Sequence, residues 1–541
     1  MTNKSIEPFM LEISKSGQET ISVPNIDGTG RKYLHSKHDP LKEAARFYAK
    51  NSVPDKSKLI ILLGIGAGYY LRKGMELFPD RIWVVVEPDL AFHSWLRHNI
   101  DMSDILNNHS IYLIKGRNRA EWLDILDLVL TVENIPNIHI VKTPCIIDEK
   151  NCVEFIKTLQ DAISFRKKNF TMYSLYAKTW IKQFFLNFPF IAQTNNIKCL
   201  IKSKKPYPAI AIGAGPSLRG FLPFLKDIKD NIYILSSDTA VPILLKEGIK
   251  PHIVISLDPR KDTSIHFERA SVDSLTSVLT PEMYPSVFSL PWKNKVLINS
   301  YLPTSRWVND NIFNLPEFRM GGNVISTILD VAGYMNMSPI YLIGVDFCFD
   351  DEMTHSDGTA YQYNTLKYLS KFLSFETLNS NRKRNETIYI NIDKERVPTS
   401  DIYFQYAQWL LYEIENHPRE YYRLHHRTLL RDKIPYFPPA RLIKTYKKNV
   451  PELKFTKPKY KTTDMRKILL ELKKDFNNSI NNNLVNTNEW VSMPLAMNIL
   501  EYHSIKNNPD KEKEYNESLT QSLLEWTKEL MELIDNAVRN L

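Results

Sequence analysis

The sequence is poor in cysteine, with four in 541 residues: Cys145, Cys152, Cys199 and Cys348. No two of them have the spacing of a zinc knuckle or of a Cys-x-x-Cys redox motif. The chain therefore shows no cysteine-based metal or redox motif, and so few thiols indicate that it works in a reducing compartment.

Long apolar runs are absent as well. No stretch of about 18 apolar residues occurs, so we expect no membrane-spanning helix. The first residues, Met1 to Glu7, lack the apolar core of a secretory signal. We therefore expect a cytoplasmic protein.

No nucleic-acid-binding motif accompanies the net charge of +9. The charge is uneven, because residues 441–474 carry twelve Lys or Arg against three Asp or Glu. Aromatic residues are sparse in this segment. We interpret it as a solvated linker or a protein-binding surface, and expect no nucleic-acid partner.

The most informative segment that is present is an apolar strand at 208–212 that runs directly into Gly-Ala-Gly-Pro-Ser-Leu at 213–218. Short apolar runs are typical of buried parallel strands. Glycines let the backbone turn tightly and approach a ligand, and Pro216 suits the first turn of a helix. The N–H groups at a helix start bind anions. The segment therefore predicts a strand, a turn and a helix start shaped for a phosphate-bearing ligand.

Three more apolar strands end in small polar or acidic residues. They are predicted within 232–238, 251–259 and 340–346, and end near Asp238, Asp258 and Asp346. In an open α/β sheet, ligands bind just beyond the carboxyl ends of the strands. The four strands together predict one ligand site.

The organisation of the chain predicts the α/β class, with two tandem Rossmann-like domains followed by a mainly α-helical carboxyl-terminal domain. We place the domains at 1–195, 196–390 and 391–541. The polar stretch that follows Asp346, up to about residue 390, has the length and composition of an active-site lid. The segment 462–541 contains no glycine and only two prolines, as expected for helices.

The first α/β unit contains its own glycine loop, Gly64 to Gly68, with Glu87 about 20 positions later. This is the pattern that holds a ribose hydroxyl in nucleotide-binding folds. Bulky Tyr69 and Tyr70 follow the loop, and Pro88 follows Glu87 directly. We favour a structural Rossmann-like domain here, with a cofactor site of the kind found in methyltransferases as the alternative.

These motifs, in this order, resemble the motility accessory factor (Maf) flagellin glycosyltransferases. The resemblance covers about residues 30–360, and its most specific parts are Gly-Ala-Gly-Pro-Ser-Leu, the Ser236 to Asp238 segment, Gly248 to Pro259, Gly321 to Val324, and Gly344 to Phe347. It implies a central domain similar to bacterial sialyltransferases. It also implies transfer of a nonulosonic acid, of pseudaminic or legionaminic type, from its CMP-sugar to Ser or Thr of flagellin. An archaeal hydroxymethyl-dihydropterin pyrophosphokinase belongs to the same wider family, so the motifs alone do not fix the reaction.

The resemblance also implies roles for single residues. His355 is the candidate base, because histidine titrates near working pH and His355-Ser356 followed by Leu369-Ser370-Lys371 resembles the sialyltransferase arrangement. Asp346 either positions His355 or caps a turn. The candidate nucleotide-binding residues are Gly213, Gly215, Pro216, Ser217, Ser237, Asp238, Asp258, Gly322 and Asn323.

The sequence departs from the sialyltransferase pattern at Ala214, where those enzymes have asparagine, and in the lack of tyrosine between residues 347 and 354. Tyr361 and Tyr363 are candidate substitutes. No metal-ligand cluster is evident and no cofactor is required, although three aspartates could bind Mg²⁺. A pyrophosphokinase, a methyltransferase and a non-enzymatic flagellin-binding adaptor remain alternatives. The sequence leaves the oligomeric state open.

Overall fold

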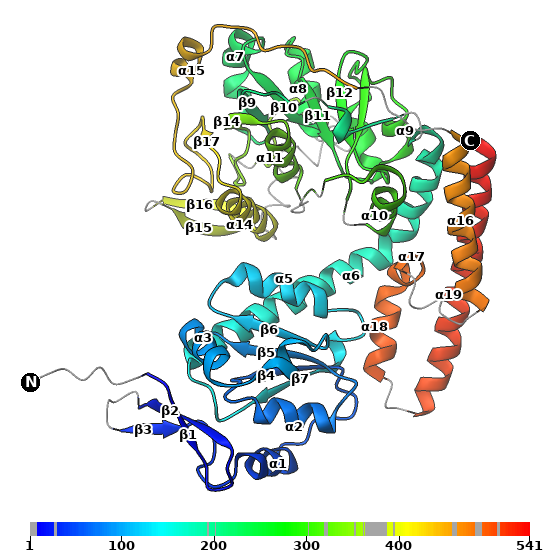
Figure 1. The fold of residues 1–541 in the computed structure, drawn as a ribbon. Helices are drawn as coiled ribbons and strands as arrows, with labels where there is room; N and C mark the ends of the chain where they lie inside the picture. The colour runs from blue at the N-terminus through cyan, green and yellow to red at the C-terminus, as the bar shows by residue number, and fades with distance from the viewer. Residues whose placement is uncertain are drawn as a thin grey trace, which may run out of the picture. The chain divides into compact units, whose positions relative to one another are not determined.

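The computed structural model shows an α/β protein (Figure 1). It describes the chain apart from residues 1–7, 26–29, 192–193, 201, 301, 317, 319–322, 351–352, 361, 363–386, 393–394, 457–461, 482–488 and 506–508. The chain forms two compact units. Unit 1 comprises Met1–Ala177 and Asn482–Thr527, and unit 2 comprises Lys178–Asn481 and Lys528–Leu541.

Unit 1 is built on a parallel four-stranded sheet of order β6-β5-β4-β7. These strands are β4 (Leu59–Leu63), β5 (Ile82–Glu87), β6 (Ile111–Lys115) and β7 (Ile138–Lys142). Every residue of β4 is buried, because helices cover both faces of the sheet. Ile60 and Leu62 pack against one apolar cluster, and Leu59, Ile61 and Leu63 against another. A continuous apolar strand is the sequence signature of this environment.

The remaining elements of unit 1 surround this sheet. The antiparallel strands β1 (Met10–Ile13), β2 (Glu19–Pro24) and β3 (Arg31–Tyr33) precede it. Its helices are α1 (Pro40–Lys50), α2 (Tyr69–Leu77), α3 (Leu90–Asn99), α4 (Ser103–Leu106), α5 (Arg119–Val129), α17 (Glu489–Ser492), α18 (Ala496–Ile505) and the first parts of α6 (Glu149–Ile191) and α19 (Pro509–Asn540). Ala496 of α18 belongs to the same apolar cluster as Leu59. A segment near the end of the sequence therefore contributes to the core of a sheet formed by residues 59–142.

Unit 2 is built on an eight-stranded sheet of order β17-β14-β9-β10-β11-β12-β13-β8, and each neighbouring pair is parallel. The strands are β8 (Asn195–Asn196), β9 (Tyr207–Ile212), β10 (Tyr233–Ser237), β11 (Ile253–Ser256), β12 (Thr276–Leu279), β13 (Asn294–Leu297), β14 (Met337–Ile343) and β17 (Tyr421–Arg423). The four strands predicted around the candidate site are β9, β10, β11 and β14, and they are neighbours.

Helices cover both faces of this sheet. In Figure 1, α7 (Leu218–Ile228) and α8 (Val241–Lys246) lie on one face and α11 (Val324–Tyr334) on the other. Leu218 and Leu225 of α7 pack on Ile210 and Ile212 of β9. The other described elements are α9 (Pro285–Phe288), α10 (Pro303–Val308), the hairpin β15 (Thr387–Ile392) and β16 (Glu395–Ser400), α14 (Asp401–Asn416), α15 (Pro439–Thr445) and α16 (Thr462–Asn481).

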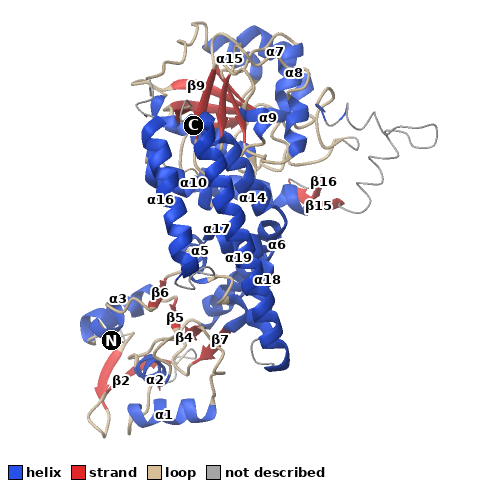
Figure 2. Ribbon diagram, turned by 90° about the vertical axis from the view of Figure 1, so that its right-hand side faces the viewer, coloured by secondary structure: helices blue, strands red, loops and turns tan. Residues whose placement is uncertain are grey.

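The ends of the long helices also belong to unit 2. Figure 2 shows α16 and α19 side by side, and Lys473 of α16 forms an ion pair with Asp535 of α19 at 2.6 Å. Lys182 of α6 pairs with Glu529 of α19 at 2.5 Å. Among the helices that the structure describes, none is both long and apolar enough to cross a membrane.

The α/β class with parallel sheets is confirmed. The domain boundaries at 195 and 390 and a separate helical domain at 391–541 stay predictions. The structure assigns residues 482–527 to unit 1 and residues 528–541 to unit 2.

Candidate functional site

The candidate site lies where β14, β9, β10 and β11 end, and we call the segments that follow these four strands the carboxyl edge. Because the strands are adjacent and parallel, their carboxyl ends lie on the same side of the sheet. Gly213 follows β9, Asp238 follows β10, and Asp346 follows β14. The sequence prediction that these strands share one edge is confirmed.

The two glycines of the turn after β9 pack against the turn after β14. Gly213 donates its N–H to Ile343 at 2.9 Å, and Gly215 donates to the carbonyl of Gly344 at 2.9 Å. A Cβ atom on Gly215 would lie 2.7 Å from both the Gly344 oxygen and an oxygen of Asp346. Close contact between the two turns, rather than close approach of a ligand, therefore accounts for these glycines.

Asp346 is bonded to the start of α7. Its Oδ2 accepts the N–H of Ser217 at 2.7 Å, and its Oδ1 accepts the Ser217 hydroxyl at 2.6 Å. A carboxylate suits a helix amino terminus, where unpaired N–H groups carry partial positive charge. The sequence predicted that the Ser217 N–H would bind an anion of the ligand. In the structure this N–H is already bonded to the carboxylate of Asp346. Pro216 lies in the turn, two residues before the helix begins at Leu218.

His425 approaches the same carboxylate, with its Nε2 3.2 Å from Oδ1 of Asp346. Both side chains are buried. Burial raises the pKa of Asp346, while His425 and Ser217 act to lower it. Burial also lowers the pKa of His425, and Asp346 opposes that shift. Sequence reasoning missed His425, because it lies far along the chain from Asp346 and no local motif marks it.

The other two aspartates are bonded to their neighbours. Asp238 accepts hydrogen bonds from the Thr239 N–H at 2.7 Å and from the Ser256 hydroxyl at 2.7 Å, which ties β10 to β11. Asp258 is partly exposed and pairs with Arg260 at 2.6 Å. These contacts stabilise the edge, and the predicted nucleotide-binding roles of both aspartates stay predictions.

Two buried hydroxyls, those of Ser237, the last residue of β10, and of Ser356 at the carboxyl edge, have no hydrogen-bond partner within the part of the chain that the structure describes. Buried polar atoms are nearly always paired. A ligand that accepts hydrogen bonds would pair them, so they are the strongest local indication of a binding site.

His355 lies next to the turn after β9, because the N–H of Ser356 donates to the carbonyl of Ala214 at 2.8 Å. Asp357 forms an ion pair with Arg219 of α7. The Nδ1 atom of His355 lies 3.0 Å from the Thr354 hydroxyl. Burial lowers the pKa of His355 to about 4, with a further contribution from His266. The imidazole is therefore neutral at pH 7, which is the form that a general base requires.

Asn323 caps α11, and its side-chain oxygen accepts the Ser326 N–H at 3.0 Å. Gly322 lies outside the described residues, as do Tyr361, Tyr363 and most of the predicted lid. Within the described ranges, no three His, Cys, Asp or Glu side chains converge on a site for a metal ion.

Phe347 ends the motif Gly344 to Phe347, and its backbone conformation is a feature that the sequence did not reveal. Its φ of 51° is left-handed, which is rare for a bulky side chain. The Thr399 hydroxyl donates to its carbonyl at 2.6 Å, so the end of β16 holds this strained residue beside Asp346. Strained backbone of this kind is concentrated at functional sites.

A family match covers most of the strands that surround this site. Residues 182–352 match the family described as "6-hydroxymethylpterin diphosphokinase MptE-like". This range contains the turn after β9 and Asp346, but not His355 or His425.

The whole chain is similar in fold to a solved structure, the Maf glycosyltransferase from Magnetospirillum magneticum AMB-1. The TM-score is 0.60 at 11% sequence identity, and the match covers 99% of this chain and 93% of that one. The predicted resemblance to the Maf proteins is thus confirmed at the level of the fold. The chain is also 28% identical, over an alignment of 127 positions, to an uncharacterized protein of Treponema pallidum (strain Nichols), and the match covers 21% of this chain. It spans about a third (32%) of the length of that relative.

Proposed function

We propose that this chain is a glycosyltransferase that moves a nonulosonic acid, of pseudaminic or legionaminic type, from its CMP-sugar to Ser or Thr hydroxyls of flagellin. One observation carries the proposal. The turn after β9, Asp346 and the His355 segment meet at one edge of a parallel sheet, joined by hydrogen bonds from Ser217 and Ser356. The fold shared with a protein titled as a Maf glycosyltransferase supports it.

The hydroxyls of Ser237 and Ser356 are suited to donate to the CMP moiety. Asp346 is suited to a different contact. It already places a carboxylate at the start of α7, and a phosphate beside it would be repelled. A ribose or sugar hydroxyl, which donates a hydrogen bond, fits that position. We therefore place the ligand phosphate nearer to the start of α11 than to the start of α7.

In the proposed reaction, the acceptor oxygen forms a bond to the anomeric carbon, and the bond from that carbon to the phosphate oxygen breaks. CMP leaves with the electron pair, and the proton of the acceptor hydroxyl passes to His355. An imidazole with a pKa of about 4 is a weak base. The negative charges of a bound CMP-sugar raise a nearby histidine pKa toward the working pH, so ligand binding would activate this base.

The proposal is tested with His355→Ala. Loss of a placed base should lower the rate of flagellin modification by about 10²–10⁴, while CMP still raises the melting temperature. His109→Ala, at an exposed position of unit 1, is the matched control and should keep the full rate. The readout is the intact mass of flagellin after incubation with the enzyme and CMP-pseudaminic or CMP-legionaminic acid. A full rate in His355→Ala would refute the role of this histidine.

One observation favours a second function. The family that matches residues 182–352 is described as a diphosphokinase of 6-hydroxymethylpterin. Such an enzyme would bind ATP with Mg²⁺ in preference to CMP. A thermal-shift comparison of CMP, CMP-sugar and ATP with Mg²⁺ on the full chain separates the two functions, because only the favoured donor should give a large shift.

A further inference from the structure

The glycine loop of unit 1, Gly64 to Gly68, is not part of the site proposed above. It joins β4 to α2, and its three glycines have φ values of 82°, 53° and 85°. All three are left-handed conformations that favour glycine. The sheet order β6-β5-β4-β7 places the loop where doubly wound folds bind ligands, beyond the carboxyl ends of the strands.

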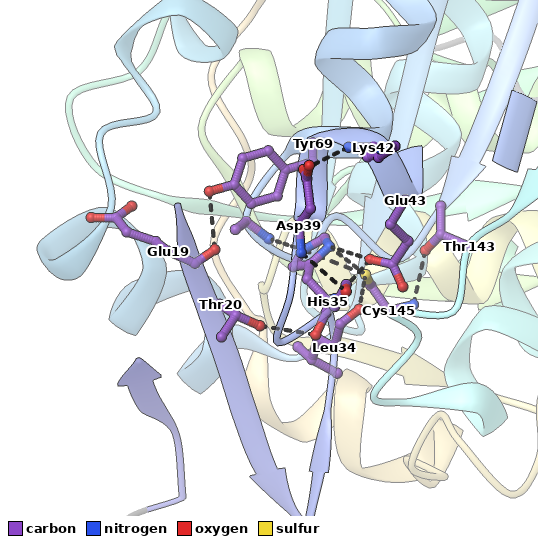
Figure 3. Close-up of polar contacts among 12 residues, drawn as sticks. Glu19, Thr20, Leu34, His35, Asp39, Lys42, Glu43, Tyr69, Thr143 and Cys145 are labelled. Atoms are coloured by element: carbon purple, nitrogen blue, oxygen red, sulfur yellow. Dashed lines mark hydrogen bonds and ion pairs between the residues drawn. The ribbon is translucent and has the colours of Figure 1, made fainter. Parts of the chain in front are cut away.

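One side of this loop is already occupied by the protein. The N–H of Ala67 donates to Nε2 of His35 at 2.8 Å, and Figure 3 shows His35 next to Cys145. A Cβ atom on Gly66 would collide with the His35 ring and would lie 2.7 Å from Sγ of Cys145. Burial lowers the pKa of His35 to about 4, so the ring is neutral and accepts this hydrogen bond. In dinucleotide-binding loops, the second glycine lets the backbone approach the pyrophosphate. Here His35 and Cys145 fill that space, which leaves no room for a pyrophosphate.

Glu87, at the end of β5, lies beside the same loop. Its Oε2 is 3.4 Å from the Ile65 nitrogen, which donates to it, and the residue is only 1% exposed. Its Oε1 has no hydrogen-bond partner in the described part of the chain. A buried carboxyl oxygen without a partner is costly. Burial raises the pKa of Glu87 to about 8, while the backbone N–H groups of Ile65 and Asp89 act to lower it.

A small cavity begins at the same loop. It measures about 10 Å³ and is lined by Ile65, His93, Leu96, Arg97, Met102 and Leu113. This volume holds about one water molecule. Its lining is mostly apolar, which suits the face of a nucleobase. The cavity is smaller than a nucleobase, so a bound base requires the buried Met102 and the short helix α4 that follows it to shift.

We propose that the glycine loop of unit 1 and Glu87 bind a ribonucleoside that carries no phosphate on its ribose, with the 2′,3′-diol donating to Glu87. The diol would pair Oε1 of Glu87, and the N–H of Gly66 would contact the ribose, because the N–H groups of the other four loop residues already bond within the protein. The space filled by His35 and Cys145 would exclude phosphate. This site lies within unit 1 and does not depend on the function proposed for unit 2.

The first test uses the unaltered full chain. Isothermal titration calorimetry with adenosine, cytidine, guanosine and uridine identifies the nucleoside that binds best. Its 2′,3′-dideoxy form should bind at least about tenfold more weakly, because the buried Oε1 of Glu87 then has no hydrogen-bond donor. The 5′-monophosphate should also bind more weakly than the nucleoside. Equal affinity of the dideoxy form, or no binding of any nucleoside at millimolar concentration, would overturn the proposal.

The second test uses two matched substitutions. Glu87→Gln should weaken binding by about tenfold or more and remove the preference for the diol. Glu76→Gln alters an exposed carboxyl of α2 and should leave both unchanged. Ser237→Ala, at the carboxyl edge of unit 2, should also leave nucleoside binding unchanged. Loss of binding in Ser237→Ala would place the nucleoside in unit 2 and refute this site, without affecting the function proposed for unit 2.

Discussion

Asp346 and Ser217 show what a sequence can and cannot reveal about single residues. Both were expected at the site, one as a catalytic residue and the other as a nucleotide-binding residue. Their bond to each other was not expected, because it depends on how far the turn after β14 extends over the turn after β9. Strand patterns give the neighbours of a residue along the chain, but not the register of two distant turns. His425 was missed for the same reason.

Gly215→Ala should destabilise the protein. The added Cβ would lie 2.7 Å from a backbone oxygen and a carboxylate oxygen, and neither can move without breaking a hydrogen bond. We expect a loss of about 1–3 kcal/mol in the free energy of unfolding. Gly220→Ala is the matched control, since a Cβ there meets nothing within 4 Å. It should stabilise α7 by about 0.5–1 kcal/mol. Urea denaturation measures both, and equal effects of the two substitutions would contradict the packing argument.

At the scale of elements, the strands around the site were predictable and several others were not. β9, β10, β11 and β14 are apolar runs bounded by glycine, proline or acidic residues, which mark a buried strand. β17 has only three residues, Tyr421 to Arg423, and is a strand only because β14 pairs with it. So short a segment has no periodicity of its own, and its structure is set by its partner.

Helix α11 allows a test that separates stability from binding. Its cap, Asn323, was predicted to bind the nucleotide, and its side chain accepts the Ser326 N–H. Asn323→Ala should cost about 1 kcal/mol of folding free energy, while Asn323→Ser keeps a capping oxygen and should cost much less. Urea denaturation reports the cap, and CMP affinity reports binding. If Asn323→Ser restores stability but not CMP affinity, the amide itself contacts the ligand. If it restores both, Asn323 acts only as a cap.

Over the whole molecule, buried titratable groups should make stability peak near neutral pH. Burial lowers the pKa of His35, His252 and His355 to about 4. Below a pH of about 6.5 the unfolded chain takes up protons that these native histidines do not, so stability falls toward acid pH. Burial raises the pKa of Glu87 to about 8 and of Glu282 to about 7. Above about pH 4.5 the native carboxyls keep protons that the unfolded chain loses, so they oppose folding increasingly up to about pH 8.

Up to about pH 6.5 the three histidines outweigh the two carboxyls, so the free energy of unfolding rises with pH. From there to about pH 8 only the carboxyls change their protonation, so the free energy of unfolding falls. Urea midpoints of the full chain at about pH 5, 6.5 and 8 should show this maximum. Glu87→Gln should reduce the fall of the urea midpoint between about pH 6.5 and 8, and Glu76→Gln should leave that fall unchanged. A midpoint that rises steadily through pH 8 in the unaltered chain would contradict the expectation.

The division of unit 1 along the chain has a consequence for biosynthesis. Its core includes Ala496, and the N–H of Met497 donates to the Ser174 hydroxyl at 2.8 Å. The ribosome makes residues 1–177 first, yet the segment that covers their apolar surface emerges only after residues 178–481, which belong to unit 2. Residues 1–177 therefore remain incompletely covered while residues 178–481 are translated. This exposes them to aggregation during that interval and makes them natural clients of chaperones.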